Sequence, residues 1–382
     1  MPPLAGLAAL AQLRMSSLPE FVARTPAEPD LGQMSMQMFY VLQALGQHEF
    51  ALEMQARALT QRRLYRIQGH DRPALRLLAV MGPGDMMDNT PLEFLTRHVA
   101  VRLDLLYVQF GQPLPDVIPE HDVAMVAIGE SDKHRDLLRH AGALLAHWPR
   151  PVINRPERVL NCARDRVWEL LRDVPQLHVP RTRRVTRREL AAVPLPCTIR
   201  PPDTHAGHGL HRVLTSADRE RCLQGLQGDE FYVSEYVDCR DADGGHRKMR
   251  VVLIDGAPYA CHLAIADDWI VHYIAAQMHL SQAKRDEEAR WMHSFDEDFA
   301  VRHATAFKEI AQRLGLDYIV LDCAQARDGR LLLFEADSRG WVHALDPVDE
   351  FAYKPAVMQK AFDAFAAMLA RRAARDQPST RV

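Results

Sequence analysis

Two apolar stretches within residues 316–346 end on carboxylates, which buried strands do not usually carry. The first stretch ends on Asp322 and the second on Glu335 and Asp337, with an Asp328-Gly329 turn signal between them. Because strand side chains alternate in direction, Glu335 and Asp337 should share one face, and an antiparallel partner can bring Asp322 onto it. Such like charges repel one another, so the pattern requires something positive among them.

Three oxygen donors on one face are the type of ligand set that Mg²⁺, or Mn²⁺, binds when it also holds substrate phosphates. The pattern therefore predicts a metal site at Asp322, Glu335 and Asp337. The alternative is a hairpin whose acidic end merely faces water, and these residues alone do not separate the two.

Basic residues also stand where a phosphate could bind. Arg200 ends another apolar stretch, and the loop after it contains His205, Gly207 and Gly209. A fixed cation followed by small residues with accessible backbone amides is typical of a triphosphate clamp. An ordinary loop remains the alternative at this point.

A pair of basic residues and a group of aromatic and polar residues are further candidates for the site. Lys248 and Arg250 should share one strand face, where their repulsion requires an anion between them unless both are solvated at the surface. Trp269, His272 and Tyr273 have the character of pocket or lid residues, although a histidine such as His272 is more often structural than catalytic.

The composition is that of a globular protein with two or three domains: 382 residues, 47% apolar and 25% charged. A formal charge of -3 gives no general attraction to nucleic acid or to a membrane, and neither is expected as a partner. The six cysteines are scattered without C-x-x-C spacing. They predict buried, reduced thiols in a cytoplasmic protein, with neither zinc nor disulfides.

The order of apolar and polar segments predicts several domains. Strands alternate with helices between residues 73 and 154, including a helix over Pro91–Arg102, and this alternation predicts a parallel sheet. A hairpin is expected at Asp255-Gly256. The predicted units are a helical region (1–72), a parallel α/β domain (73–155), a small subdomain (156–236), a C-terminal subdomain (237–372) and a tail (373–382).

The N-terminal region contains two helical patterns in residues 34–66, broken near Gly46-Gln47. They resemble a single tetratricopeptide-type hairpin, whereas solenoids of that kind need about three copies to be stable. We therefore expect a docking helix pair, for a protein partner or a second copy of the chain. One face of an earlier helix is expected at Leu4, Leu7, Leu10 and Leu13.

The order of these motifs over residues 73–371 resembles that of the ATP-grasp superfamily of carboxylate–amine ligases, which includes glutathione synthetase and D-alanine:D-alanine ligase. Such proteins place an α/β domain before two α+β subdomains that hold ATP between them. The resemblance implies the fold class α/β and α+β, with a helical segment in front.

The resemblance also implies roles for individual residues. Two arginines in place of the family's lysines, and a hinge strand that contacts adenine through its backbone, are expected at ATP. These residues are Arg166, Arg200, Glu235, Tyr236 and Val237, with Asp238 or Asp241 near the ribose. Those expected at the reacting groups are Arg250 on the transferred phosphate, Asp322, Glu335 and Asp337 on the metal, and Arg339 and Gly340 beside the substrate. Asp337 departs from the family's usual asparagine, and arginine keeps the charge of lysine while changing its geometry.

The implied activity is an ATP-dependent ligase that joins a carboxylate to an amine, in small molecules or peptides, through an acylphosphate. ATP and Mg²⁺ would be its cofactors. A kinase-like phosphotransferase is one alternative, and it would give a phosphorylated product without an amine. A non-catalytic ATP-binding scaffold or sensor, holding a partner on its N-terminal helices, is the other.

Overall fold

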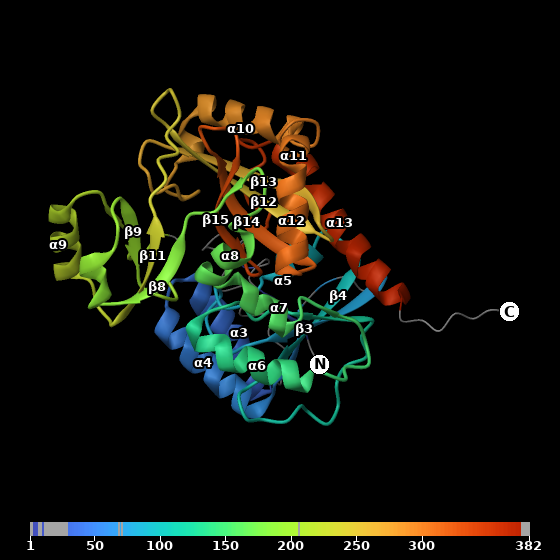
Figure 1. The fold of residues 1–382 in the computed structure, drawn as a ribbon. Helices are drawn as coiled ribbons and strands as arrows, with labels where there is room; N and C mark the ends of the chain where they lie inside the picture. Colours follow the sequence, from blue (N-terminus) through green and yellow to red (C-terminus); the bar gives the residue numbers. More distant parts are fainter. Residues whose placement is uncertain are drawn as a thin grey trace.

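Three β-sheets organise the part of the chain that the structure describes (Figure 1). This computed structural model describes residues 3–6, 10, 30–67, 69, 72–204 and 207–375, so the predicted site residue His205 lies outside the described residues. A six-stranded sheet comes first, followed by sheets of four and five strands. The predicted fold class, α/β and α+β, is confirmed.

The first sheet is mainly parallel, as the alternation of strands and helices predicts. Its order is β1 (Pro3–Leu4), β2 (Leu64–Ile67), β4 (Val101–Tyr107), β3 (Leu75–Met81), β5 (Val123–Val126) and β6 (Val152–Ile153). Strand β3 is parallel to β4 and β5, and β5 to β6, whereas β2 runs antiparallel to β4. All residues of β5 are apolar and buried, as expected of a parallel strand covered on both faces. Short helices follow the strands: α5 (Leu92–Thr96), η2 (Asp132–His134) and α6 (Arg135–Leu144).

Two expectations about this part of the chain are wrong. The helix expected over Pro91–Arg102 is confined to α5, because β4 begins at Val101 and its side chains enter the core of the sheet. Leu4 was expected on a helix face, but it pairs with β2 in strand β1 and is fully buried. Leu7 and Leu13 lie outside the described residues.

The two predicted N-terminal helices are present as α3 (Leu31–Ala44) and α4 (His48–Gln61), and Gly46 between them has a φ of 72°. Both helices pack onto the first sheet. The side-chain amide of Gln55 accepts the N–H of Gly84 at 2.8 Å and donates to its carbonyl at 2.9 Å. The likeness to a tetratricopeptide hairpin and the role in partner binding remain predictions.

The four-stranded sheet is antiparallel and has its own core. Its order is β10 (His211–Val213), β9 (Cys197–Arg200), β11 (Glu230–Glu235) and β8 (Thr182–Thr186), with η4 (Glu189–Ala192) and α9 (Ser216–Gly225) beside it. Ile199, Phe231 and Val233 belong to a hydrophobic cluster that is separate from the main core. In Figure 1 this sheet and α9 stand out to one side of the molecule.

The five-stranded sheet has the order β13 (Ala257–Ala266), β12 (His246–Ile254), β14 (Tyr318–Gln325), β15 (Leu331–Asp337) and β7 (Leu177–His178). Both predicted hairpins are present, with Asp255-Gly256 between β12 and β13 and Asp328-Gly329 between β14 and β15. Strand β7 pairs with β15, although it falls in the 156–236 segment, so the domain limits stay predictions. The helices of this part are α7 (Pro156–Val159), η3 (Leu160–Cys162), α8 (Arg164–Leu171), η5 (Met278–Leu280), α10 (Gln282–Ser294), α11 (Phe299–Arg302), α12 (Ala304–Leu314) and α13 (Lys354–Arg375).

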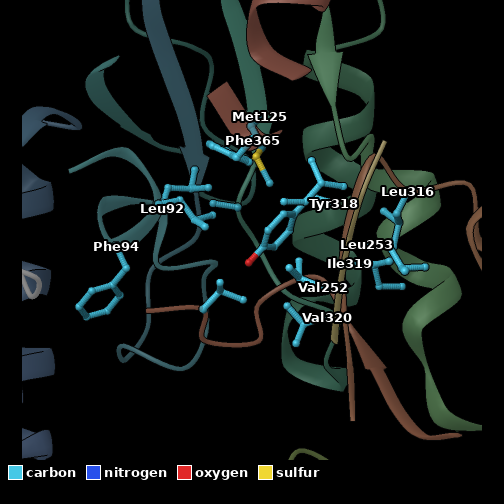
Figure 2. Close-up of a cluster of buried hydrophobic side chains, with 14 of the residues drawn as sticks. Leu92, Phe94, Met125, Val252, Leu253, Leu316, Tyr318, Ile319, Val320 and Phe365 are labelled. Atoms are coloured by element: carbon cyan, nitrogen blue, oxygen red, sulfur yellow. The ribbon is translucent and has the colours of Figure 1, made fainter. Parts of the chain in front are cut away.

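The first sheet and the five-stranded sheet share one hydrophobic core (Figure 2). Tyr318 of β14 is fully buried, and its ring meets the ring of Phe365 of α13 edge-on, with 5.8 Å between centroids. Asn154, just after β6, fastens the two sheets together. Its side chain accepts the N–H of Tyr318 at 3.0 Å and donates to the Tyr318 carbonyl at 2.8 Å. These two sheets therefore form one body, and the four-stranded sheet forms another.

The cysteines are free thiols, and the predicted burial is confirmed for all of them except Cys239, which is partly exposed. Burial raises the pKa of the Cys261 thiol to about 12, which keeps it protonated and unreactive at neutral pH. No helix among the described residues is long and apolar enough to cross a membrane.

His303, directly before α12, makes the stability of the protein depend on pH. Its ring lies 4.5 Å from that of Phe299, and its Nε2 has no hydrogen-bond partner among the described residues. Burial first, and then Arg302, lowers the pKa of His303 to about 4. Between that value and the ordinary pKa of about 6.5, the unfolded chain binds a proton that the folded chain does not.

The free energy of unfolding should therefore decrease as the pH falls from about 6.5 toward 4. His303→Phe keeps an aromatic ring and should reduce the proton uptake on unfolding in this range by about one proton. Urea unfolding followed across the range measures that slope. An unchanged slope in the variant would mean that folded His303 is already protonated.

Candidate functional site

A cavity of about 780 Å³ lies between the four-stranded and five-stranded sheets, within the size range of small-molecule sites. Both sheets contribute side chains to it, and so does the loop after β3, through Asp85, Met86 and Met87. Eleven of the predicted site residues line this cavity: Arg200, Gly207, Glu235, Tyr236, Val237, Arg250, Asp322, Glu335, Asp337, Arg339 and Gly340.

One wall of the cavity carries a row of polar residues across four neighbouring strands, which we call the cross-strand row. His262 of β13 pairs with Arg250 of β12, Arg250 pairs with Asp322 of β14, and Asp322 pairs with Glu335 of β15. Directly paired residues project from the same face of a sheet. The prediction that the antiparallel partner brings Asp322 beside Glu335 is therefore confirmed.

Asp322 is the anion that Lys248 and Arg250 require between them. Lys248 Nζ donates to its Oδ2 at 3.0 Å, and Arg250 Nε donates to its Oδ1 at 2.8 Å. Burial alone would raise the pKa of Asp322, but Arg250 and Lys248 outweigh that effect and hold the pKa below its usual range. The carboxylate is therefore ionised in spite of its burial.

Arginines supply the positive charge that the other two carboxylates require. Arg164, the first residue of α8, donates to Glu335 at 2.5 Å. Asp337 accepts the backbone N–H of Arg339 at 3.0 Å and its Nε at 3.2 Å. Arg339 is buried and packs so closely against Gly129 that a Cβ there would lie 2.1 Å from its Cδ.

Arg200 lines the cavity close to Arg164. It is buried and donates through Nε to the Thr204 hydroxyl at 3.1 Å. Burial, followed by repulsion from Arg164, lowers the pKa of Arg200 to about 10, although Glu335 opposes the change. Because these two guanidinium groups repel one another, an anion bound between them would be stabilised.

Two observations decide whether a divalent cation fits the site: which oxygen donors are present, and which cationic side chains already bind them. Asp322 and Glu335 are directly paired oxygen donors, as Mg²⁺ prefers. Each of them is at present bound by cationic side chains, and within the described residues no three His, Cys, Asp or Glu side chains gather as a metal site. A metal would therefore compete with these basic partners for the oxygens of the two carboxylates.

The four-stranded sheet is tied to η2, which follows strand β5 of the first sheet, beside the cavity. Asp132 accepts two hydrogen bonds from Arg184 of β8, at 2.5 and 2.6 Å. Asp203, which lines the cavity, accepts the backbone N–H groups of Asp132 at 2.8 Å and Lys133 at 3.3 Å. These contacts hold the loop after β9 in place.

Three predicted nucleotide contacts lie elsewhere. Arg166 does not line the cavity and pairs with Glu169 on the exposed side of α8, because two helix positions turn a side chain by roughly 200°. Arg164 takes its place as the candidate. Asp238 pairs with Arg240 and Arg327 outside the cavity lining, and Gly209 is likewise absent from that lining.

His262 and Arg164 line the cavity but were not among the residues predicted for the site. The only available signal was that a histidine interrupts the otherwise apolar strand β13 at a position opposite Arg250. Trp269, His272 and Tyr273 were expected in a pocket or lid, and all three line the cavity.

A buried network behind the cavity supports Tyr273. Lys354 of α13 lies within 3.1 Å of Glu288 and 2.8 Å of Asp346, bonds the Tyr273 hydroxyl and lies 4.3 Å from the centre of its ring. Tyr353 donates to Glu288 at 2.6 Å. Burial raises the pKa of Glu288, and Lys354 opposes that rise. The lysine thus holds together α10, α13 and the loops that line the cavity.

Lys354→Met should destabilise the protein by about 3–5 kcal/mol, because it leaves buried carboxylates without their cation. Lys360→Met on the same helix is the matched control. The Lys360 pair with Asp296 is half exposed, so its loss should cost no more than about 1 kcal/mol. Chemical denaturation of both variants measures the difference, and equal costs would contradict a stabilising role for the buried network.

No protein-family model and no curated protein matches this sequence. Among solved structures, the chain is similar to a RimK-domain ATP-grasp protein from Sphaerobacter thermophilus, with 14% identity over 77% of this chain and 99% of that chain and a TM-score of 0.47. It is similar to the VanG D-Ala:D-Ser ligase from Enterococcus faecalis, with 11% identity over 77% of this chain and 99% of that chain and a TM-score of 0.49. It is also similar to the D-alanine-D-alanine ligase from Coxiella burnetii, with 10% identity over 79% of this chain and 96% of that chain and a TM-score of 0.48. At these identities and TM-scores, the function has to be argued from the site itself.

Proposed function

We propose that this protein is an ATP-dependent carboxylate–amine ligase of the ATP-grasp type, which works through an acylphosphate. The observation that carries the proposal is the cross-strand row. It places Arg250, Asp322 and Glu335 side by side on the wall of one large cavity. The motif order of the sequence assigns these same residues to the phosphoryl group and the metal.

The site has partners for both halves of a magnesium nucleotide. Phosphates would attract Arg164 and Arg200, while Mg²⁺ would be held by Asp322 and Glu335. Without a ligand, the arginines and the carboxylates of the site neutralise one another. A magnesium nucleotide carries both negative phosphates and a positive metal, so it can bind the arginines and the carboxylates together and leave little net charge uncompensated. When bound, the metal would neutralise charge on the phosphates. Glu235, Tyr236 and Val237 would lie along the adenine.

In the first step a substrate carboxylate attacks the γ-phosphate of ATP, the bond from that phosphorus to ADP breaks, and an acylphosphate and ADP result. Arg250 is fixed for this task, because Asp322 holds one side of its guanidinium and the Trp341 carbonyl accepts from Nη1 at 3.1 Å. A cation held in this way stabilises charge that spreads over the phosphoryl oxygens without having to reorganise. An amine then displaces phosphate from the acyl carbon.

The substrates would be a carboxylate and an amine, as small molecules or peptides, and the cavity has room for ligands at the upper end of the usual size range. Free thiols agree with the cytoplasmic location that we propose. The helices α3 and α4 are our candidates for contact with a protein partner or a second copy of the chain.

A non-catalytic ATP-binding protein is the second candidate, and one observation favours it. Asp322, Glu335 and Asp337 are each bound by a basic side chain, as expected of a site that binds a nucleotide without a catalytic metal. Such a protein would gain thermal stability from ATP without producing ADP.

Glu335→Gln should abolish turnover, with a loss of about 10²-fold or more, because it removes a charge from the proposed metal site and keeps the shape of the side chain. The measurement is ADP and phosphate release with Mg²⁺-ATP and pooled carboxylic acids and amines. Glu169→Gln, which removes an exposed carboxylate on α8, is the matched control and should retain full activity.

ADP release that requires both an acid and an amine would support the ligase. Release with an acid or alcohol alone and a phosphorylated product would point to a kinase. Turnover that survives in Glu335→Gln would exclude Glu335 from the site, and stabilisation by ATP without ADP release would favour the non-catalytic protein.

A further inference from the structure

His262 occupies the end of the cross-strand row beside Arg250. It lines the cavity, and it lies on β13 next to a bulge in the pairing with β12, the strand that separates β13 from the strand of Asp322. If Arg250 contacts the phosphoryl group, the acyl carbon that carries this group lies near Arg250 as well. The imidazole of His262 is therefore beside the position where the second step takes place.

The orientation of the His262 ring is fixed from behind by an aromatic contact. Its centroid lies 4.4 Å from that of Tyr273, and the two planes are inclined by 32°. Tyr273 is held in turn by Lys354 and Asp346. The two nitrogens of His262 have no hydrogen bond to any described residue, so the ring has a fixed position and an uncommitted proton acceptor.

The groups around His262 favour its neutral form. Arg250 and Lys248 on β12 and Lys354 on α13 are cations on the packed elements, and Asp322 on β14 is the opposing carboxylate. Burial, followed by Arg250 and Lys354, holds the pKa of His262 well below its usual range. The neutral imidazole has a lone pair for a proton, and the negative charge of an acylphosphate bound at Arg250 would offset the cations that disfavour the imidazolium.

Of the four other histidines that line the cavity, His343 and His272 are placed less favourably for proton transfer. His343 Nδ1 already accepts the backbone N–H of Leu345 at 3.3 Å. His272 lies in a segment without regular secondary structure between β13 and η5, and it does not belong to the cross-strand row. A catalytic base needs a position fixed by rigid elements, which His262 has.

We propose that His262 is the catalytic base of the second step and takes the proton that the acceptor amine loses. The amine lone pair forms the C–N bond to the acyl carbon, and the C–O bond to phosphate breaks with its electron pair on the phosphate oxygen. The proton moves from the nitrogen to His262 and then to the departing phosphate. This inference rests on the proposed function and adds a residue to it.

The test separates the two half-reactions. Hydroxylamine attacks acylphosphates without a protein base, so acid-dependent hydroxamate formation reports the first step. His262→Gln should keep that reaction within a small factor of the wild type. The same variant should form amide from the acid and amine pools at least about 10²-fold more slowly, as expected for loss of a general base. His293→Gln, an exposed residue of α10, is the control.

Each outcome decides one point. If the wild type forms neither hydroxamate nor amide, the proposed function fails and this inference falls with it. If His262→Gln forms amide at the wild-type rate, or loses hydroxamate formation equally, His262 is not the base, while the ligase proposal stands.

A measurement that needs no substrate provides a second check. NMR spectra of protein labelled with ¹⁵N-histidine, assigned by comparison with His262→Gln, should show a neutral ring at pH 7. An imidazolium at that pH would overturn the inference. The melting temperature of His262→Gln verifies that the variant is folded.

Discussion

The burial of Asp322 between Lys248 and Arg250 is the constraint on which the site depends. An ionised carboxylate inside a protein is costly unless charged partners surround it, and these partners come from the neighbouring strand. A shift of one residue in the pairing of β12 with β14 would move Arg250 to the opposite face of the sheet. Charge neutralisation therefore fixes the strand register, and the register places Glu335 and His262 in the same row.

The sequence was sufficient for features that are determined locally. The hairpins at Asp255-Gly256 and Asp328-Gly329 follow from turn residues between apolar stretches, and the alternation of side chains put Asp322 and Glu335 on one face. The repulsion argument also predicted that Lys248 and Arg250 hold an anion between them. In each case the relevant residues are neighbours along one strand or across one hairpin.

The sequence was insufficient where a contact depends on distant segments. The resemblance pointed to Arg166, but the packing of α8 directs Arg164 into the cavity, and nothing in the local sequence decides between two arginines that are two positions apart. The Lys354 network joins residues up to 81 positions apart, which no local pattern encodes. The order of the motifs likewise indicated that carboxylates would bind a metal. It did not indicate that arginines and a lysine would already be bound to those carboxylates.

The separate core of the four-stranded sheet has a consequence for how ligands enter and leave. A unit with its own core can rotate as a rigid body without exposing the main core, and the Asp132–Arg184 pair is one of the contacts that such a rotation would break. Both side chains of that pair are partly exposed, so mobile ions can weaken it. The rate at which the cavity opens would then depend on ionic strength, whereas the chemistry inside, shielded by the two sheets, would not.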